Sequence, residues 1–130
     1  MGLKGRITHL QTLPAQQGVS YGPSYTTQHE TRVATLPMGY ADGIPRNLSN
    51  QLWGLCQGVT IPQIGAITMD QIMWDVTALP NVALGSVITL LDTRPCTQLT
   101  LTPWANQLNT IEYELMCGLR VRLPKIYVRD

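Results

Sequence analysis

Several features that would point to common functional classes are scarce in this sequence. Only 13% of its 130 residues are charged and the net charge is +1, which gives no electrostatic basis for binding nucleic acid or a membrane surface. No apolar run approaches the ~20 residues of a membrane-spanning helix, and the first residues lack the apolar stretch of a signal peptide. The three cysteines form no CxxC pair, which favours reduced thiols in a cytoplasmic protein over a disulfide framework. We therefore expect a cytoplasmic protein without nucleic-acid or membrane partners.

The patterns of familiar metal and hydrolase sites are also missing. The two histidines, His9 and His29, lie in no HExxH or paired-histidine spacing, so no metal site is expected. No serine lies in a GxSxG context, and the glycines form no phosphate-binding loop ahead of a helix. The carboxylates are few and scattered along the chain. Composition and spacing alone therefore indicate a mostly β, cytoplasmic domain and no specific activity.

The apolar residues that are present follow the pattern of short strands separated by turns. A length of 130 residues suits one domain, and Gly- and Pro-containing turn signals recur throughout. We expect strands at residues 6–13, 30–36, 59–61, 64–76 (two strands broken near Asp70 and Gln71), 86–91 and 123–128. The fold class predicted from this pattern is mainly all-β, a small Greek-key-like β-barrel that spans residues 1–130 as one domain.

One short helix is expected near residues 103–109. Thr102 can cap it, Pro103 suits its first turn, and Trp104 and Leu108 fall one turn apart on the same face.

Tyrosines beside Gly, Pro, Asp or Glu are the other notable feature, at Tyr21, Tyr25, Tyr40 and Tyr113. Side chains at such element ends often reach a cleft. From placement alone, however, they are interpreted as packing residues whose hydroxyl groups find backbone partners.

Four segments, taken together, resemble the alanine racemase family. Residues 19–25 (VSYGPSY) are similar to its VSYGxxY segment, and residues 32–46 (RVATLPMGYADGIPR) to its RxATLPxGYADGxxR block. Residues 69–77 (MDQIMWDVT) and 110–124 resemble two further blocks, in the same order. The resemblance implies the C-terminal β-domain of a pyridoxal-phosphate-dependent enzyme. The N-terminal (β/α)8 barrel of that enzyme is absent from this chain, so we expect an excised domain.

The resemblance also implies how the chemistry is divided. In the family, a homodimer, the barrel holds pyridoxal phosphate on a lysine, and the C-terminal domain of the other subunit covers that site. Racemisation removes the α-proton from one face of the amino acid and returns one to the other face, so two opposed bases are needed. The lysine serves one face, and by motif Tyr21 is the catalytic base for the other. A free phenol has a pKa near ~10, so cationic groups of the partner subunit have to favour its ionised form.

Further site residues follow from the same motifs. Tyr40 would line the substrate entrance, and Met69 would offer its backbone N–H to the substrate carboxylate. Tyr113 would hydrogen-bond the cofactor phosphate. Arg46 and Asp70 would belong to the substrate entrance or its supporting network, with an ordinary structural salt bridge as the competing account.

Two positions depart from the family pattern. Ala66 stands where the family often has Arg, which removes a positive charge near the expected entrance. Glu112 replaces the common Asn before Tyr113, and we expect its carboxylate to point away from the cofactor phosphate.

The function implied is interconversion of L- and D-alanine, which supplies D-alanine for the peptidoglycan cell wall. Two alternatives stay open: a related racemase with another substrate, such as serine, and a non-catalytic β-barrel interaction domain. We expect the isolated domain to be inactive and not to retain pyridoxal phosphate.

Overall fold

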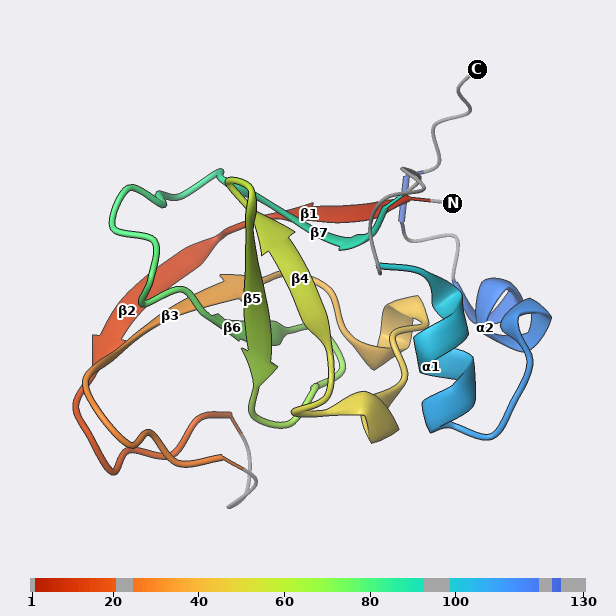
Figure 1. Ribbon diagram of the computed structural model, residues 1–130, viewed down its shortest axis with the longest axis horizontal. Helices are drawn as coiled ribbons and strands as arrows, with labels where there is room; N and C mark the ends of the chain where they lie inside the picture. Colours follow the sequence, from red (N-terminus) through yellow and green to blue (C-terminus); the bar gives the residue numbers. More distant parts are fainter. Residues whose placement is uncertain (1, 21–24, 93–98, 120–122, 125–130) are drawn as a thin grey trace.

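One antiparallel sheet dominates the computed structural model, which describes residues 2–20, 25–92, 99–119 and 123–124. Within these residues seven strands are hydrogen-bonded in the order β1-β7-β4-β5-β6-β3-β2 (Figure 1). The strands are β1 (Leu3–Arg6), β2 (His9–Leu13), β3 (Thr31–Leu36), β4 (Trp53–Cys56), β5 (Val59–Ile64), β6 (Ile72–Asp75) and β7 (Val87–Leu91).

The two edge strands of this sheet are consecutive in the chain. Only Ile7 and Thr8 separate β1 from β2, and both residues continue the pairing, since Ile7 N–H donates to Ser86 (2.9 Å) and Thr8 N–H to Thr35 (3.0 Å). Because one nearly continuous segment occupies both edges, the sheet has to curl round on itself into a half-barrel (Figure 1). The mainly β, barrel-like fold class is thereby confirmed.

The core fills the curl of the sheet. Trp74 on β6 is fully buried, and Gly54 on β4 makes room for its indole ring. A Cβ atom on Gly54 would lie 2.9 Å from Trp74 Cζ3 and 2.9 Å from Ile88 Cγ2, closer than packed atoms normally approach.

Arg32, in the motif at residues 32–46, has a structural task. Its guanidinium donates to the carbonyl oxygens of Leu79 (3.2 Å), Pro80 (3.3 Å) and Val82 (2.9 Å). It thus ties the loop after β6 to β3.

Some strand boundaries differ from those expected. The single strand predicted at 6–13 is two strands, because the chain changes edge at Ile7 and Thr8. Residues 65–71 form a loop, so the strand predicted just after Ile64 was wrong. Strand β4 was not predicted. Of the strand predicted at 123–128, only Leu123 and Pro124 are described, and neither is in a strand.

The predicted helix is present as α1 (Leu101–Gln107). Its N-cap is Thr100, so the predicted cap at Thr102 was wrong, while Pro103 does lie in the first turn. Trp104 is buried against the sheet, as the helical spacing indicated.

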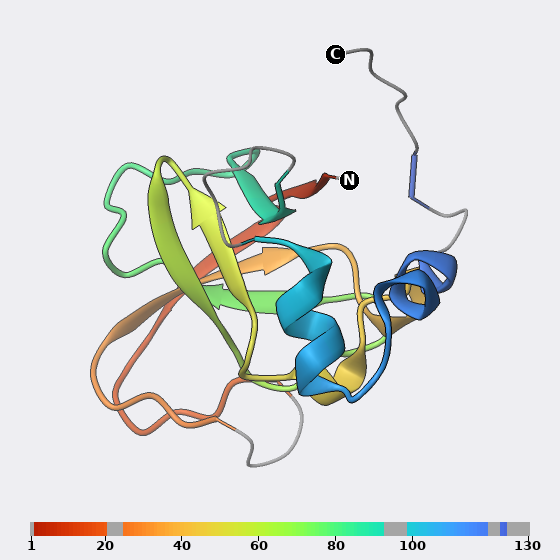
Figure 2. The ribbon, with the colours of Figure 1, turned by 45° about the vertical axis from the view of Figure 1, so that its right-hand side comes forward.

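A second helix, α2 (Glu112–Gly118), was not predicted. It lies beside α1 at one end of the sheet (Figure 2). Only one of its seven residues, Leu115, is buried, which leaves too little apolar periodicity to recognise in the sequence. The Thr102 hydroxyl donates a hydrogen bond to the Glu112 carboxylate and so links the two helices.

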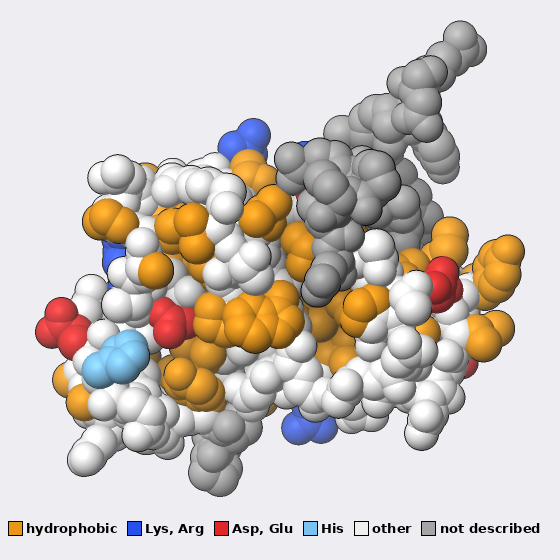
Figure 3. Space-filling model, viewed as in Figure 1, with side chains coloured by type: hydrophobic (Ala, Val, Ile, Leu, Met, Phe, Trp, Pro, Cys, Tyr) orange, Lys and Arg blue, Asp and Glu red, His pale blue; other side chains and the backbone are white. Residues whose placement is uncertain are grey.

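Charged side chains are few and scattered on the face shown in Figure 3, in keeping with the low charge of the sequence. Apolar side chains are exposed over β4 and β5, where Trp53 and Val59 are the large ones.

Candidate functional site

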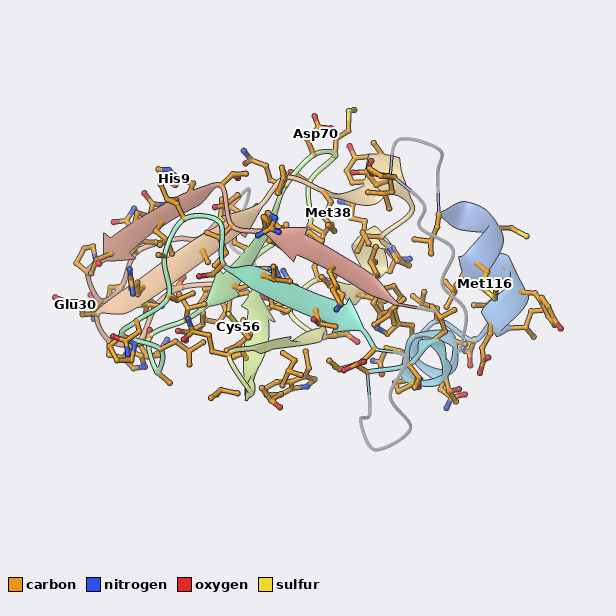
Figure 4. The ribbon with its side chains drawn as sticks, turned by 90° about the horizontal axis from the view of Figure 1, so that it is seen from above. His9, Glu30, Met38, Cys56, Asp70 and Met116 are labelled. Carbon is orange, nitrogen blue, oxygen red and sulfur yellow. The ribbon has the colours of Figure 1, made fainter. Side chains whose placement is uncertain are left out.

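A pocket of about 590 Å³ opens beside the loop that joins β5 to β6. Asp70 lies at the tip of this loop (Figure 4). Two 3-10 helices, η1 (Tyr40–Asp42) and η2 (Arg46–Leu48), contribute the other wall. The residues that line the pocket are Tyr40, Arg46, Ala66, Ile67, Thr68, Met69, Asp70 and Gln71. The fold therefore gathers Tyr40, Arg46, Met69 and Asp70, which come from two motifs far apart in the sequence, into one place.

Direct backbone contact holds η1 against the loop. Tyr40 N–H donates to the Thr68 carbonyl (2.9 Å) and Ala41 N–H to the Met69 carbonyl (3.1 Å). Gly39 is required at this crossing, because a Cβ atom there would lie 2.0 Å from the Thr68 oxygen. The buried Asp42 carboxylate accepts a hydrogen bond from Gly39 N–H (3.0 Å) and caps η1.

The backbone groups of Met69 are only partly paired within the part of the chain that the structure describes. Its carbonyl is bonded to Ala41, but no acceptor for its N–H is found among the residues that the structure describes. Its side chain is 51% exposed. With respect to the described residues, this donor is therefore available to a ligand oxygen without the loss of a hydrogen bond of the fold.

The side chains of the buried Gln63 and of Asn50 hold the beginning of the same loop. The Gln63 side chain, 2% exposed, donates to the carbonyls of Ile64 (3.1 Å) and Gly65 (2.8 Å) and accepts from Asn50 N–H (2.6 Å). Asn50 in turn accepts from Gly65 N–H (2.7 Å). Sequence reasoning missed both residues. A signal did exist, since the period of two along β5 puts Gln63 on the same buried face as Ile61.

The segment that precedes Tyr21 is anchored at this loop. Ser20 Oγ donates to the Ala66 carbonyl (2.7 Å), and Ala66 lines the pocket. Val19 N–H donates to the Tyr25 carbonyl (3.1 Å), so the described residues that precede and follow residues 21–24 are hydrogen-bonded to each other. Tyr21 itself lies outside the described residues.

Tyr113 is not among the residues that line this pocket. It lies on α2 with 75% of its surface exposed. Its neighbour Glu112 directs its carboxylate to Thr102 on α1.

A second pocket of about 410 Å³ lies between η2 and the two α-helices. Arg46 lines both pockets. Gly43, in the left-handed region at φ 101°, lets the backbone pass the end of α2, since a Cβ atom there would lie 2.1 Å from the Gly118 oxygen.

Two absences hold for the part of the chain that the structure describes. No group of three or more His, Cys, Asp or Glu side chains is placed to hold a metal ion there. None of the helices there is long and apolar enough to cross a membrane.

Comparison with known proteins gives a consistent picture. The family model "Alanine racemase, C-terminal domain" matches residues 1–127. An alanine racemase from Nostoc sp. is 48% identical over 126 residues, which cover 97% of this chain and 33% of that protein. The chain thus spans about a third of the length of the curated relatives it matches.

Solved structures agree with the sequence match. The alanine racemase of Streptomyces coelicolor A3(2) superposes with a TM-score of 0.89 at 33% identity, over 99% of this chain and 33% of that one. The alanine racemase of Bartonella henselae, solved with covalently bound pyridoxal phosphate, gives a TM-score of 0.87 at 30% identity, over 98% of this chain and 34% of that one.

Proposed function

Because this chain belongs to the family of alanine racemase C-terminal domains, we propose that it completes the active site of a pyridoxal-phosphate-dependent alanine racemase. The observation that carries the proposal is the single pocket formed by Tyr40, Arg46, Met69 and Asp70. The family motifs assign substrate contacts or the substrate entrance to these residues, and the fold places them together.

The cofactor has to be held mainly by other parts of the enzyme. Lys4 is the one lysine among the described residues, and it lies on β1, paired with Thr89, rather than in the pocket. The exposed hydroxyl of Tyr113 is suited to donate to a phosphate, whereas no cradle for a cofactor ring surrounds it on α2. The residues present thus fit a peripheral contact to pyridoxal phosphate, which when bound supplies a sink for the charge of the deprotonated substrate.

The pocket is suited to a small carboxylate substrate. Arg46 is the cation among its lining residues, and the Met69 N–H is a donor for which the described residues offer no acceptor. A guanidinium attracts a carboxylate toward the pocket, and the N–H then fixes one oxygen. Ala66 adds no charge, so attraction at this entrance falls to Arg46.

Tyr21 would supply the proton-transferring group. Ser20 is held at the pocket wall by Ala66, so the chain enters residue 21 from a fixed point beside the pocket. Tyr21 would take or return the α-proton on one face of the substrate, and a lysine of the rest of the enzyme would serve the other face. In this proposal the active enzyme is a cytoplasmic homodimer, and this chain alone neither racemises alanine nor retains the cofactor.

A chimera tests the proposal directly. The 126 residues of this chain that match the Nostoc alanine racemase at 48% identity would replace the corresponding third of that enzyme. D-alanine formation from L-alanine would be measured with added pyridoxal phosphate. The controls are the Nostoc enzyme cut before that third, and this chain alone.

We expect racemisation by the chimera and none by either part. A chimera that folds, binds the cofactor and forms no D-alanine would contradict the proposal. D-alanine formation by this chain alone would contradict the division of the active site. A parallel chimera with the Streptomyces coelicolor enzyme guards against misfolding of the first.

A further inference from the structure

We propose that Gln63 is a positioning residue for binding of the substrate carboxylate, acting through the loop that carries Met69. The inference rests on the proposed function and assigns a task to a residue that lies outside the pocket. Gln63 is not among the lining residues, so any effect on substrate has to pass through the loop at residues 65–71.

The side-chain amide of Gln63 makes hydrogen bonds through both its nitrogen and its oxygen. It is 2% exposed, its two donated bonds go to the carbonyls of Ile64 and Gly65, and its oxygen accepts from Asn50 N–H. Removing the amide takes a hydrogen-bond partner from the two buried carbonyls and from the partly buried Asn50 N–H. Buried unpaired groups are costly, so the backbone would move to find others.

Side chains hold the beginning of the loop, because it has no strand partner there and its backbone bonds to Tyr40 and Ala41 come only at Thr68 and Met69. Gly65 breaks the extended conformation at φ 82°, and the chain does not rejoin the sheet until β6. Over this gap Gly65 N–H is bonded to Asn50 Oδ1 (2.7 Å) and Ile67 N–H to Ser49 Oγ (2.8 Å). Gln63 is the buried member of this network, and it joins β5 to the turn after η2.

The network connects the two walls of the pocket. Ser49 and Asn50 directly follow η2, which begins with Arg46, while Gly65 and Ile67 lead into Thr68 and Met69. Through this network Gln63 would help to set the position of the loop backbone at Met69 relative to η2, which carries Arg46.

The Gln63→Met substitution keeps the volume of the side chain and removes its amide. In the active chimera we expect KM for alanine to rise by about tenfold with kcat little changed, because the Met69 contact binds ground state and transition state alike. Propionate has the carboxylate without the amino group, and its inhibition constant should rise by the same factor. Inhibition by ethylamine, which lacks the carboxylate, should not change.

A control variant that destabilises the fold elsewhere distinguishes a positioning role of Gln63 from a general loss of stability. Ile88→Ala, on β7 and away from the pocket, destabilises the core without touching the loop. It should leave KM for alanine and the propionate constant unchanged. Equal changes in both variants, or an unchanged KM in a folded Gln63→Met chimera, would overturn the proposal.

A second readout does not depend on catalysis. Amide hydrogen exchange in the 130-residue chain should accelerate by about tenfold at residues 65–71 in Gln63→Met, and not in Ile88→Ala. If the unsubstituted chimera is inactive, the proposed function fails while exchange still tests whether Gln63 holds the loop. Exchange unchanged at residues 65–71 would contradict the inference.

Should Gln63→Met not fold, Ser49→Ala at the partly exposed edge of the network takes its place. It should show the same pattern, a raised KM and propionate constant with kcat unchanged. A folded Ser49→Ala chimera with the original KM would count against the proposal.

Discussion

Ser20 donates a 2.7 Å hydrogen bond from its hydroxyl to the carbonyl oxygen of Ala66. Ser20 directly precedes Tyr21, and Ala66 lines the pocket with Met69. This one bond therefore links the chain that leads to the proposed base with the loop that carries the proposed carboxylate donor.

The Ser20→Ala substitution removes the hydrogen bond between these two segments. We expect a loss of about 1 kcal/mol in the free energy of unfolding, measured by urea denaturation of the chain, and a lower kcat in the active chimera. Thr8→Ala is a suitable control, because it removes a hydroxyl-to-carbonyl bond at the closure of the barrel. If both variants changed kcat equally, the link between Ser20 and catalysis would be wrong.

Gly39→Ala should be one of the most damaging small substitutions in the chain. The new Cβ atom would lie 2.0 Å from the Thr68 oxygen, so η1 and the loop have to separate. We expect a loss of about 3 kcal/mol or more, measured by urea denaturation. Gly18→Ala is the matched control, since nothing lies within 4 Å of its added Cβ atom. A similar loss of unfolding free energy in the two variants would show that the backbone at Gly39 does not closely contact the loop at Thr68.

The buried thiol of Cys56 predicts a dependence of stability on pH. Burial raises the pKa of Cys56, so the folded chain keeps a proton that the unfolded chain loses near pH ~8.5. The contribution of the thiol to stability is therefore fully present below that pH and declines as pH rises above it.

Urea unfolding of the unsubstituted chain and of Cys56→Ala, compared between neutral and alkaline pH, checks this. The stability difference between the two proteins should be constant up to about pH 8.5 and then narrow. A difference that stays constant into the alkaline range would mean that Cys56 is not protected by burial.

The strands and the pocket residues were predicted from different signals in the sequence. Strand β3 and strand β7 are β-branched, apolar runs whose local pattern is sufficient to predict them. Tyr40, Arg46, Met69 and Asp70 were found only through family motifs, and nothing local shows that two distant segments meet. Their meeting depends on Gly39, whose missing Cβ atom lets two backbones touch.

Other features depend on contacts that no local pattern encodes. The loop at residues 65–71 reads as strand because Ile64 and Ile67 are β-branched, yet the side chains of Gln63 and Asn50 hold it out of the sheet. Helix α2 buries only Leu115 and is joined to α1 through Thr102 and Glu112. Tyr113, placed by motif, lies on that helix, and its partners belong to parts of the enzyme outside this chain in our proposal.

The central claim is that this chain supplies a base to a racemase active site, and Tyr21→Phe in the active chimera tests it most directly. The substitution removes one oxygen atom and leaves the ring. We predict a fall of about 10²–10⁴-fold in turnover of L-alanine, with cofactor absorbance and the urea unfolding midpoint unchanged. Turnover equal to that of the unsubstituted chimera would contradict the account.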